Sequence, residues 1–384
     1  MRKPQQAPSL NALFGKITPE ALEQARTDKY IDFARRASHK YYHWDKMRFV
    51  ARSEKLDPEV VWLMEKLRRV PQLQDLPLRG YKGETLKYSI PPVVQEELMR
   101  VDQQLAGEFT TQDEQPLPGQ KERFIISALR EEAIASSMLE GAVTTRVDAK
   151  EMLRKGRKPK THGERMVLNN YQAINFIRDQ KDVDLSPEFL LELQKILTEN
   201  TLEREDEVGR FRTASDDVTV VDDRDGEIMH TPPPAEELDD RLARLCDFAN
   251  QDHGQRHFIH PVVKACVLHF QVGFDHPFCD GNGRTARALF YWSMLRSGYW
   301  LFEYLPISRL IFAGAVKYAR AFLYTETDDF DATYFLAYKM SVIQRARSEF
   351  NDYVARKMLA MSQARRLYAK DTRLNHRQRE VVLQ

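Results

Sequence analysis

Hydrophobic side chains recur at helical spacing along almost the whole chain. Between Tyr30 and Arg69 they follow one another every three or four positions, and Asp57-Pro58 marks a fresh helix start within this stretch. Pro91-Pro92 opens a further helix. The same spacing predicts later helices at about 121–140, 164–180, 186–199, 234–250, 261–275, 283–297, 307–326 and 332–369, with a break in the last one. The pattern therefore predicts a mainly α fold.

One segment has β periodicity instead. Two short β-prone runs lie at 218–221 and 228–231, and the turn dipeptide Asp225-Gly226 separates them. The first run consists of Val218, Thr219, Val220 and Val221. The segment predicts a hairpin. A lone hairpin buries little, so it is either decoration or a device that presents a strand edge to another chain.

Proline and glycine divide the chain into parts. Leu76 to Gly80 is typical of a turn, and Pro116 to Gly119 forms a short break. We take this break as a boundary between a helical N-terminal module over 1–115 and a main domain over 120–345. The remaining residues, 346–384, are expected to form a basic helical extension.

The C-terminal region is the basic part of a chain that is otherwise balanced in charge. Residues 345–384 hold ten Arg and Lys against four Asp and Glu, and Leu374 to Gln378 resembles the opening of a winged-helix module. A solvated basic helix explains the same charges. The whole chain has a net charge of +1, so any nucleic-acid face must be local.

Composition narrows the class of protein. The chain has 384 residues, of which 42% are hydrophobic and 30% charged, which excludes a disordered chain and a polytopic membrane protein. No apolar run follows the first charged residues, so we expect neither a secretory signal nor a membrane anchor. The three cysteines lack metal-ligand spacing, and we expect reduced thiols in the cytoplasm.

The run from His276 to Arg287 concentrates chemistry between two predicted helices. Gly281 and Gly283 permit close approach of a ligand, and the free N–H groups that begin the second helix form an anion site. Arg284 and Arg287 are three residues apart, and their guanidinium groups suit phosphate oxygens. The run therefore predicts a site for a phosphorylated ligand.

Two further side chains in this run point to catalysis. Asp280 offers a hard oxygen ligand to Mg²⁺, and His276 can act as a base near neutral pH. Taken singly, each feature has an ordinary structural explanation, such as a helix cap or a solvated face. Their joint presence within one short run favours transfer of a phosphorus-centred group from a nucleotide.

The same run resembles the signature of Fic-domain proteins, His-x-Phe-x-(Asp/Glu)-Gly-Asn-Gly-Arg-x-x-Arg, and it matches at every fixed position. The resemblance extends over roughly 120–345 and implies a Fic-type helical bundle. Such proteins mostly transfer AMP from ATP to a Ser, Thr or Tyr hydroxyl of a protein and release pyrophosphate. The resemblance thus implies an adenylyltransferase that uses ATP and Mg²⁺ on a protein substrate, including itself.

The resemblance also assigns roles to residues. It implies that His276 deprotonates the target hydroxyl and that Asp280 holds Mg²⁺. It implies that Arg287 holds the γ-phosphate. The remaining nucleotide-binding residues that it implies are Phe278, Gly281, Asn282, Gly283, Arg284 and Tyr318.

The resemblance also assigns a function to the predicted hairpin. Gly209 to Arg212 and the residues that follow resemble the approach to the family's flap, which is expected at about 214–234. In the family the flap binds an extended target segment by strand addition. We therefore expect residues 218–221 to contact the target, although a merely solubilising loop explains the acidic composition there equally well.

Two details concern the nucleotide. The phosphorylating Doc branch of the family has Lys at the second motif glycine, whereas this chain keeps Gly283, which favours AMP transfer. Residues 312–315 lack the Asn-Arg pair of many relatives, so another nucleoside triphosphate stays open.

Ser136 and Glu140 lie upstream, near the end of the helix predicted at about 121–141. They are four residues apart and share one helix face, and a Glu in the last turn opposes the helix dipole. An exposed Glu before the cap residue Gly141 explains this as well. The stretch resembles the family's inhibitory motif, (Ser/Thr)-x-x-x-Glu-(Gly/Asn), whose Glu pairs with the second motif Arg. The resemblance therefore implies autoinhibition by Glu140.

Two other functions stay open. The same site would remove AMP from a modified protein if Glu140 positioned a water molecule. Alternatively, the chain is a nucleotide-sensing regulator whose basic C-terminus binds DNA, although the sequence ends before a recognition helix is complete. Whether the chain forms a homodimer is also open.

Overall fold

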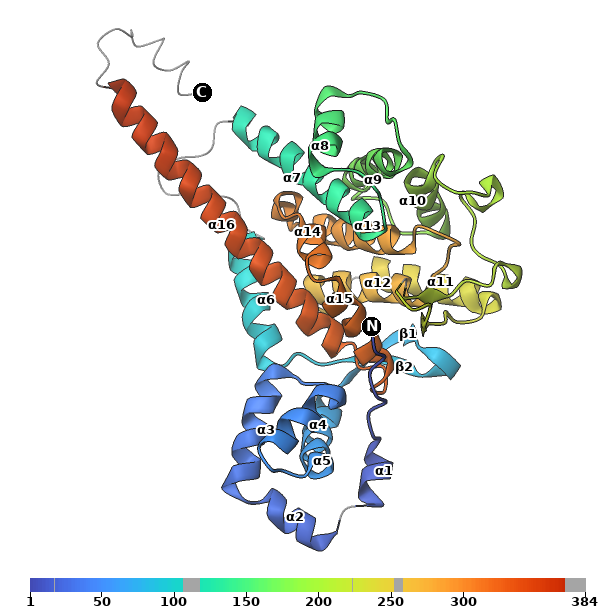
Figure 1. Ribbon diagram of the computed structural model, residues 1–384, viewed down its shortest axis with the longest axis vertical. Coiled ribbons are helices and arrows are strands. Elements are labelled where there is room, and N and C mark those ends of the chain that lie inside the picture. Colours follow the sequence, from blue (N-terminus) through green and yellow to red (C-terminus); the bar gives the residue numbers. More distant parts are fainter. Residues whose placement is uncertain (17, 106–117, 223, 252–257, 370–384) are drawn as a thin grey trace.

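The computed structural model describes residues 1–16, 18–105, 118–222, 224–251 and 258–369. Helices make up most of these residues, and the strands form two small antiparallel hairpins (Figure 1). The predicted mainly α fold is confirmed.

The N-terminal part has a hydrophobic core of its own. Its helices are α1 (Leu10–Phe14), α2 (Pro19–Ala25), α3 (Asp28–Lys40), α4 (Trp44–Ser53) and α5 (Pro58–Arg69). The helix start predicted at Asp57 is confirmed, because the Asp57 side chain accepts a hydrogen bond from the Glu59 N–H at 2.8 Å. Trp62, fully buried, packs near Trp44 in this core, which lies at one end of the molecule (Figure 1).

A hairpin follows this core. Strand β1 (Gln74–Arg79) pairs with β2 (Thr85–Tyr88), and Lys87 in β2 also pairs with Asp331 in a later loop. The turn predicted at Leu76 is wrong. Leu76 and Leu78 are both buried on one face of β1, while Pro77 lies where the strand register shifts and needs no ladder hydrogen bond.

The remaining elements form the main helical bundle. After α6 (Pro92–Leu105) these are α7 (Pro118–Leu139), α8 (Arg146–Lys155), α9 (His162–Asp179), α10 (Pro187–Thr198), α11 (Leu238–Asn250), α12 (Pro261–Asp275), α13 (Asn282–Arg296), α14 (Ile307–Phe312), α15 (Ala315–Glu326) and α16 (Thr333–Ala369). Short 3₁₀ turns connect several of them. Helices α12 and α13 are buried in the middle of the bundle, so the loop between them begins and ends on rigid elements.

Several predicted bounds change. The helix predicted at about 307–326 is divided by Ala313 and Gly314 into α14 and α15. Helix α16 is continuous, so the predicted break is wrong, and α16 runs past α6 along the side of the bundle (Figure 1). The sequence pattern missed α8, which follows the cap residue Thr145 and ends before Gly156.

The second hairpin is shorter than predicted. Strand β3 covers Val220–Val221 and β4 covers Ile228–His230, so Val218 and Thr219 lie outside the strand. Leu374 to Gln378, the predicted opening of a winged helix, lies outside the described residues. Within the part of the chain that is described, no helix is both long and apolar enough to cross a bilayer.

Candidate active site

The loop between α12 and α13 is held by its own side chains and backbone. Asn282 accepts a hydrogen bond from the Phe278 N–H at 2.9 Å and donates one to the Phe278 carbonyl at 2.8 Å. The Phe278 ring is fully buried beneath the loop and stacks on Phe211, with 5.4 Å between centroids. Gly281 has φ of +86°, which favours glycine, and it directs the chain into α13. The loop is therefore preorganised.

His276 ends α12 in the left-handed conformation, with φ of +44°. Its Nδ1 lies 2.6 Å from the Gly273 carbonyl, which can only accept, so Nδ1 carries the proton and Nε2 is the basic nitrogen. Burial, together with the nearby His230, lowers the pKa of His276 to about 4. The imidazole is therefore neutral at pH 7 and can accept a proton at Nε2.

Asp280 and Arg284 form an ion pair across the first turn of α13. The distance from Arg284 Nη2 to Asp280 Oδ2 is 2.9 Å, and Arg284 Nη1 donates to the Leu197 carbonyl at 2.9 Å. The Arg284 side chain is fully buried, whereas that of Asp280 is 48% exposed. Both residues line the start of α13, but the guanidinium of Arg284 is already engaged by protein atoms.

Arg287 contacts the end of α7. Its Nε donates to Ser136 Oγ at 2.8 Å, its Nη2 donates to the Ser136 carbonyl at 3.0 Å, and its Nη1 lies 2.9 Å from Glu140 Oε1. Burial disfavours the charge of Arg287, but Glu140 and other neighbours outweigh it and raise the pKa of the guanidinium. Residues that are about 150 positions apart in the sequence are thus brought together, in the pairing that the resemblance implied.

Gly283 lies against this ion pair. A Cβ atom at Gly283 would overlap Glu140 Oε1 and would come within 3.1 Å of Arg287 Nη1. Any larger residue there would displace the Glu140 carboxylate. The second motif glycine is therefore needed for the observed contact between Glu140 and Arg287.

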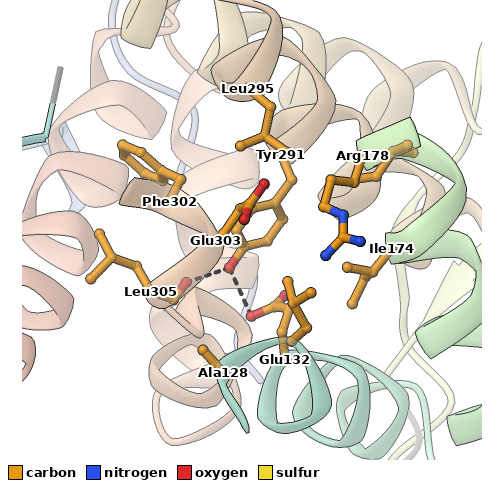
Figure 2. A pocket seen from close by; sticks show the side chains of 11 residues that line it. Ala128, Glu132, Ile174, Arg178, Tyr291, Leu295, Phe302, Glu303 and Leu305 are labelled. Carbon is orange, nitrogen blue, oxygen red and sulfur yellow. Dashed lines mark hydrogen bonds between the residues drawn. The ribbon is translucent and has the colours of Figure 1, made fainter. Parts of the chain in front are cut away.

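Helix α7 is also anchored one turn earlier than Ser136. The buried carboxylate of Glu132 accepts hydrogen bonds from the Tyr291 hydroxyl at 2.8 Å and from the Ser308 N–H at 2.9 Å. Figure 2 shows Glu132 and Tyr291 in a cavity of about 10 Å³, which has room for no more than one water molecule. Burial raises the pKa of Glu132 against the effect of these donors. No sequence motif marks Glu132 as part of the site.

Tyr318 lies further from the loop. Its hydroxyl is 2.8 Å from His269 Nε2, and burial raises its pKa to about 12, while Arg287 acts in the opposite direction. Tyr318 therefore lies beside the guanidinium of Arg287. No contact with residues 276–284 is found for it among the described residues.

Three residues that sequence reasoning missed support the loop from outside. Gln194 donates to the Asp280 carbonyl at 3.4 Å and accepts from the Gly209 N–H at 2.6 Å. Arg212 and His230 both bind carbonyl groups at the end of α12. The run from Gly209 to Arg212 resembles the approach to the family's flap, but nothing in the sequence pattern indicates which of its side chains reaches α12.

The residues expected to form the flap make up the β3–β4 hairpin, which lies on the surface beside this support. Val220 pairs with His230 and Val221 pairs with Ile228 across the hairpin. Val221 is 45% exposed and Ile228 is 50% exposed, so apolar side chains are accessible on both strands.

Comparison with known proteins agrees with this geometry. The model of the Fic/DOC family matches residues 184–294, a range that contains the whole run from His276 to Arg287. Residues 184–294 of this chain form a Fic domain. The match covers the α10 to α13 part of the bundle, and it includes the β3–β4 hairpin.

The relatives found by sequence align with only part of this chain. The protein adenylyltransferase Fic of Nematostella vectensis is 26% identical over 182 residues, which is 47% of this chain and 39% of the relative. Protein adenylyltransferase fic-1 of Caenorhabditis briggsae is 38% identical over 69 residues, which is 18% of this chain and 13% of the relative. The alignments thus cover well under half of these relatives' lengths.

Solved structures support the Fic fold over most of the chain. Fic-1 (residues 134–508) from C. elegans has a TM-score of 0.57 at 17% identity, and the match covers 91% of this chain and 92% of that one. A Fic family protein from Desulfovibrio desulfuricans has a TM-score of 0.55 at 24% identity, covering 69% of this chain and 76% of that one. At these identities the likeness shows the fold alone.

Proposed function

We propose that this Fic-domain protein transfers AMP from ATP to a Ser, Thr or Tyr hydroxyl of a target protein and of itself. The observation that carries the proposal is the neutral His276, whose Nε2 is available as a base at the entrance to the α13 N-terminus. The relatives named protein adenylyltransferase support the same reaction.

The start of α13 suits the triphosphate. The first N–H groups of a helix have no acceptor within the helix, and the helix dipole favours negative charge at this end. We assign the phosphates to the backbone of Gly281, Asn282 and Gly283, with Arg287 on the γ-phosphate. Arg284 reaches a phosphate by exchanging its contact with Asp280.

The residues present fit a magnesium ion. Asp280 is half exposed, and each of its oxygens accepts one hydrogen bond, from the Gly281 N–H or from Arg284, which leaves lone pairs for a hard cation. Mg²⁺ is commonly held by one or two carboxylates together with substrate phosphates, so a single Asp is sufficient. When bound, the ion neutralises phosphate charge.

The reaction then follows from the positions of these groups. The target hydroxyl oxygen attacks the α-phosphorus, and the bond from that phosphorus to the oxygen bridging to the β-phosphate breaks. His276 Nε2 accepts the hydroxyl proton, and pyrophosphate leaves with the bridging oxygen. The flap strand β3 binds an extended segment of the target beside His276.

We further propose that Glu140 inhibits this reaction. In the observed state the Nη1 of Arg287 is occupied by Glu140 and its Nε by Ser136, so the γ-phosphate has no anchor. A triphosphate bound without this anchor has its α-phosphate out of line with the hydroxyl near His276.

Removal of AMP from a modified protein is the second candidate. The Glu140 side chain is 29% exposed, and its charge acts on His276, so a water molecule between the two could be oriented by the carboxylate. Both candidates use one site, and they predict opposite effects of deleting Glu140.

One experiment tests the proposed function. The Glu140→Gly variant is incubated in lysate with labelled ATP, GTP, CTP and UTP in turn, and labelled proteins and residues are identified. We expect label from ATP on hydroxyl side chains, and none when His276→Ala is added. Label from no nucleotide would contradict the proposal, and label from another nucleotide would change the substrate.

The other expectations from the sequence stay predictions. These concern the cytoplasmic location, a homodimer, DNA binding, and the boundaries at 115, 120 and 345. Apolar residues of 76–105 pack in the main core, whereas those of 7–63 form the separate N-terminal core.

A further inference from the structure

The last turn of α12 is held by one side chain that precedes the flap, Arg212, and by one that belongs to it, His230. The last carbonyl groups of a helix have no partner within the helix. Here the Phe274 carbonyl lies 2.7 Å from His230 Nε2, and Arg212 donates to the Asp275 carbonyl at 3.1 Å and to the His276 carbonyl at 2.6 Å. The backbone that carries the base is thus bound both by the residue run before the flap and by strand β4 of the flap.

The hydrogen bonds of His230 define the orientation of its ring. Because the Phe274 carbonyl only accepts, Nε2 carries a proton. On the other side of the ring, Nδ1 lies 3.0 Å from Glu326 Oε2, and a carboxylate also only accepts. Both ring nitrogens thus face acceptors, and these contacts fix the orientation of the buried imidazole.

Tyr81 completes the surroundings of His230. It comes from the 3₁₀ turn Tyr81–Gly83 between β1 and β2, and its hydroxyl donates to the Thr231 carbonyl and lies 3.0 Å from His230 Nδ1. Its ring packs edge-on against Phe274, with 4.8 Å between centroids. Three distant segments, the first hairpin, β4 and the end of α15, therefore meet at His230.

We propose that His230 is a positioning residue for His276, and that Tyr81 and Glu326 fix His230 in that role. By binding the Phe274 carbonyl, His230 sets the end of α12 and hence the direction of His276 Nε2. Because His230 belongs to β4, strand addition at the flap and placement of the base are coupled. This inference rests on the proposed function.

The charges around His276 are consistent with this role. The imidazole rings of His230 and His276 are 6.0 Å apart between centroids. Besides burial, His230 and Arg212 lower the pKa of His276, while the Gly273 carbonyl and Glu140 raise it. His230 therefore helps to keep the base neutral as well as placed.

The test uses the full chain with Glu140→Gly as the parent. Into this parent we introduce His230→Phe, His230→Gln and Tyr81→Phe, with the exposed His39→Phe as a matched control. Transfer of label from ATP to the lysate protein that the parent labels most strongly gives kcat and the KM for ATP, and the pH dependence of kcat/KM is measured for each.

We expect His230→Phe to lower kcat by about 10- to 100-fold, the scale of a misplaced catalytic group, with the KM for ATP changed by less than about twofold. His230→Gln keeps an N–H for the Phe274 carbonyl, so it should recover most of kcat. Since Gln carries no charge, the acidic limb of its pH profile should lie at higher pH than that of the parent. Tyr81→Phe should lower kcat by about 3-fold, because it removes the two contacts of one hydroxyl but leaves those of His230 with the Phe274 carbonyl and Glu326.

Other results would overturn the inference. Equal kcat in His230→Phe and the parent contradicts it, as does a loss in His230→Phe that His230→Gln does not recover. If His230→Phe does not fold, the test rests on Tyr81→Phe and His230→Gln. A pH profile of His230→Gln that is identical to that of the parent then contradicts the inference. If the folded parent transfers no label, the proposed function fails instead, and the inference fails with it.

Discussion

Glu140 at the end of α7 and Arg287 on α13 form an ion pair, with 2.9 Å between Oε1 and Nη1, directly over Gly283. The pair lies at the position where the γ-phosphate is expected. A charge-assisted contact of this kind must be exchanged before a phosphate can bind there. The proposed control of the enzyme depends on this one competition.

The role of His276 gives the first prediction. In the Glu140→Gly background, His276→Ala should lower AMP transfer by at least about 100-fold, because loss of a general base commonly costs 10²- to 10⁴-fold. ATP binding should be retained, since the N-terminus of α13 is untouched. Initial rates and ATP affinity measured by calorimetry check both parts. A variant that keeps more than about a hundredth of the parent rate would argue against His276 as base.

The pH dependence gives the second prediction. Because the pKa of His276 is lowered to about 4, the base is unprotonated down to that pH, and the acidic limb of kcat/KM should lie well below the ordinary histidine value of about 6.5. Between pH 6.5 and 4 the unfolded chain binds the proton first, so His276 should make the fold less stable as pH falls through this window. Rates and denaturant unfolding across this range provide the check, and His276→Ala should reduce the stability change. An acidic limb at about 6.5 would be inconsistent with the buried, neutral imidazole.

Asp280 gives the third prediction. Asp280→Ala should remove both activity and the response to added Mg²⁺. The reason is that, among the described residues of the loop between α12 and α13, Asp280 carries the carboxylate that can bind the ion. Asp280→Asn is the matched control for shape, and it should lose metal affinity while keeping the loop. Metal titration by calorimetry gives a readout besides activity. A metal titration identical to that of the parent would refute the assignment.

Gly283 gives the fourth prediction. In the otherwise unchanged chain, Gly283→Ala should push the Glu140 carboxylate away from Arg287, since the added Cβ overlaps Oε1. Label transfer should therefore rise above that of the unchanged chain, while the Cβ contact with Arg287 keeps it below that of Glu140→Gly. Gly15→Ala, where the nearest atom to a Cβ is 3.8 Å away, is the control and should have no effect. If label transfer does not rise, displacement of Glu140 from Arg287 does not by itself relieve the inhibition, and the prediction is wrong.

The sequence predicted the parts of the fold that rest on local patterns. Helix α12 has the predicted bounds because Pro261 opens it and apolar residues recur at helical spacing up to Phe274. Strand β1 was missed because Leu-Pro-Leu-Arg-Gly is typical of a turn, and only the register shift around Pro77 makes a strand compatible with proline. The continuity of α16 could not be predicted because packing against α6 and α12 overrides weak local propensity.

In the candidate site, too, the residues close together in sequence could be predicted, and those brought together only by the fold could not. The run from His276 to Arg287 was predicted because its residues are adjacent in sequence. The contact between Glu140 and Arg287 came from a resemblance, since no local pattern joins residues so far apart. Arg212 and His230 were missed because they reach α12 from 64 and 44 residues away, and only tertiary packing brings them there.

The central claim, that Glu140 restrains a transferase, is tested most directly by measuring Glu140→Gly against the unchanged chain in both directions, with ATP and with an AMP-modified target. We predict a large rise in AMP transfer, because Arg287 becomes available to the γ-phosphate without any new contact. If AMP removal were the activity, the same variant would instead lose hydrolysis. Transfer and removal rates that both match those of the unchanged chain would contradict the account and would reduce Ser136 to Gly141 to a helix end.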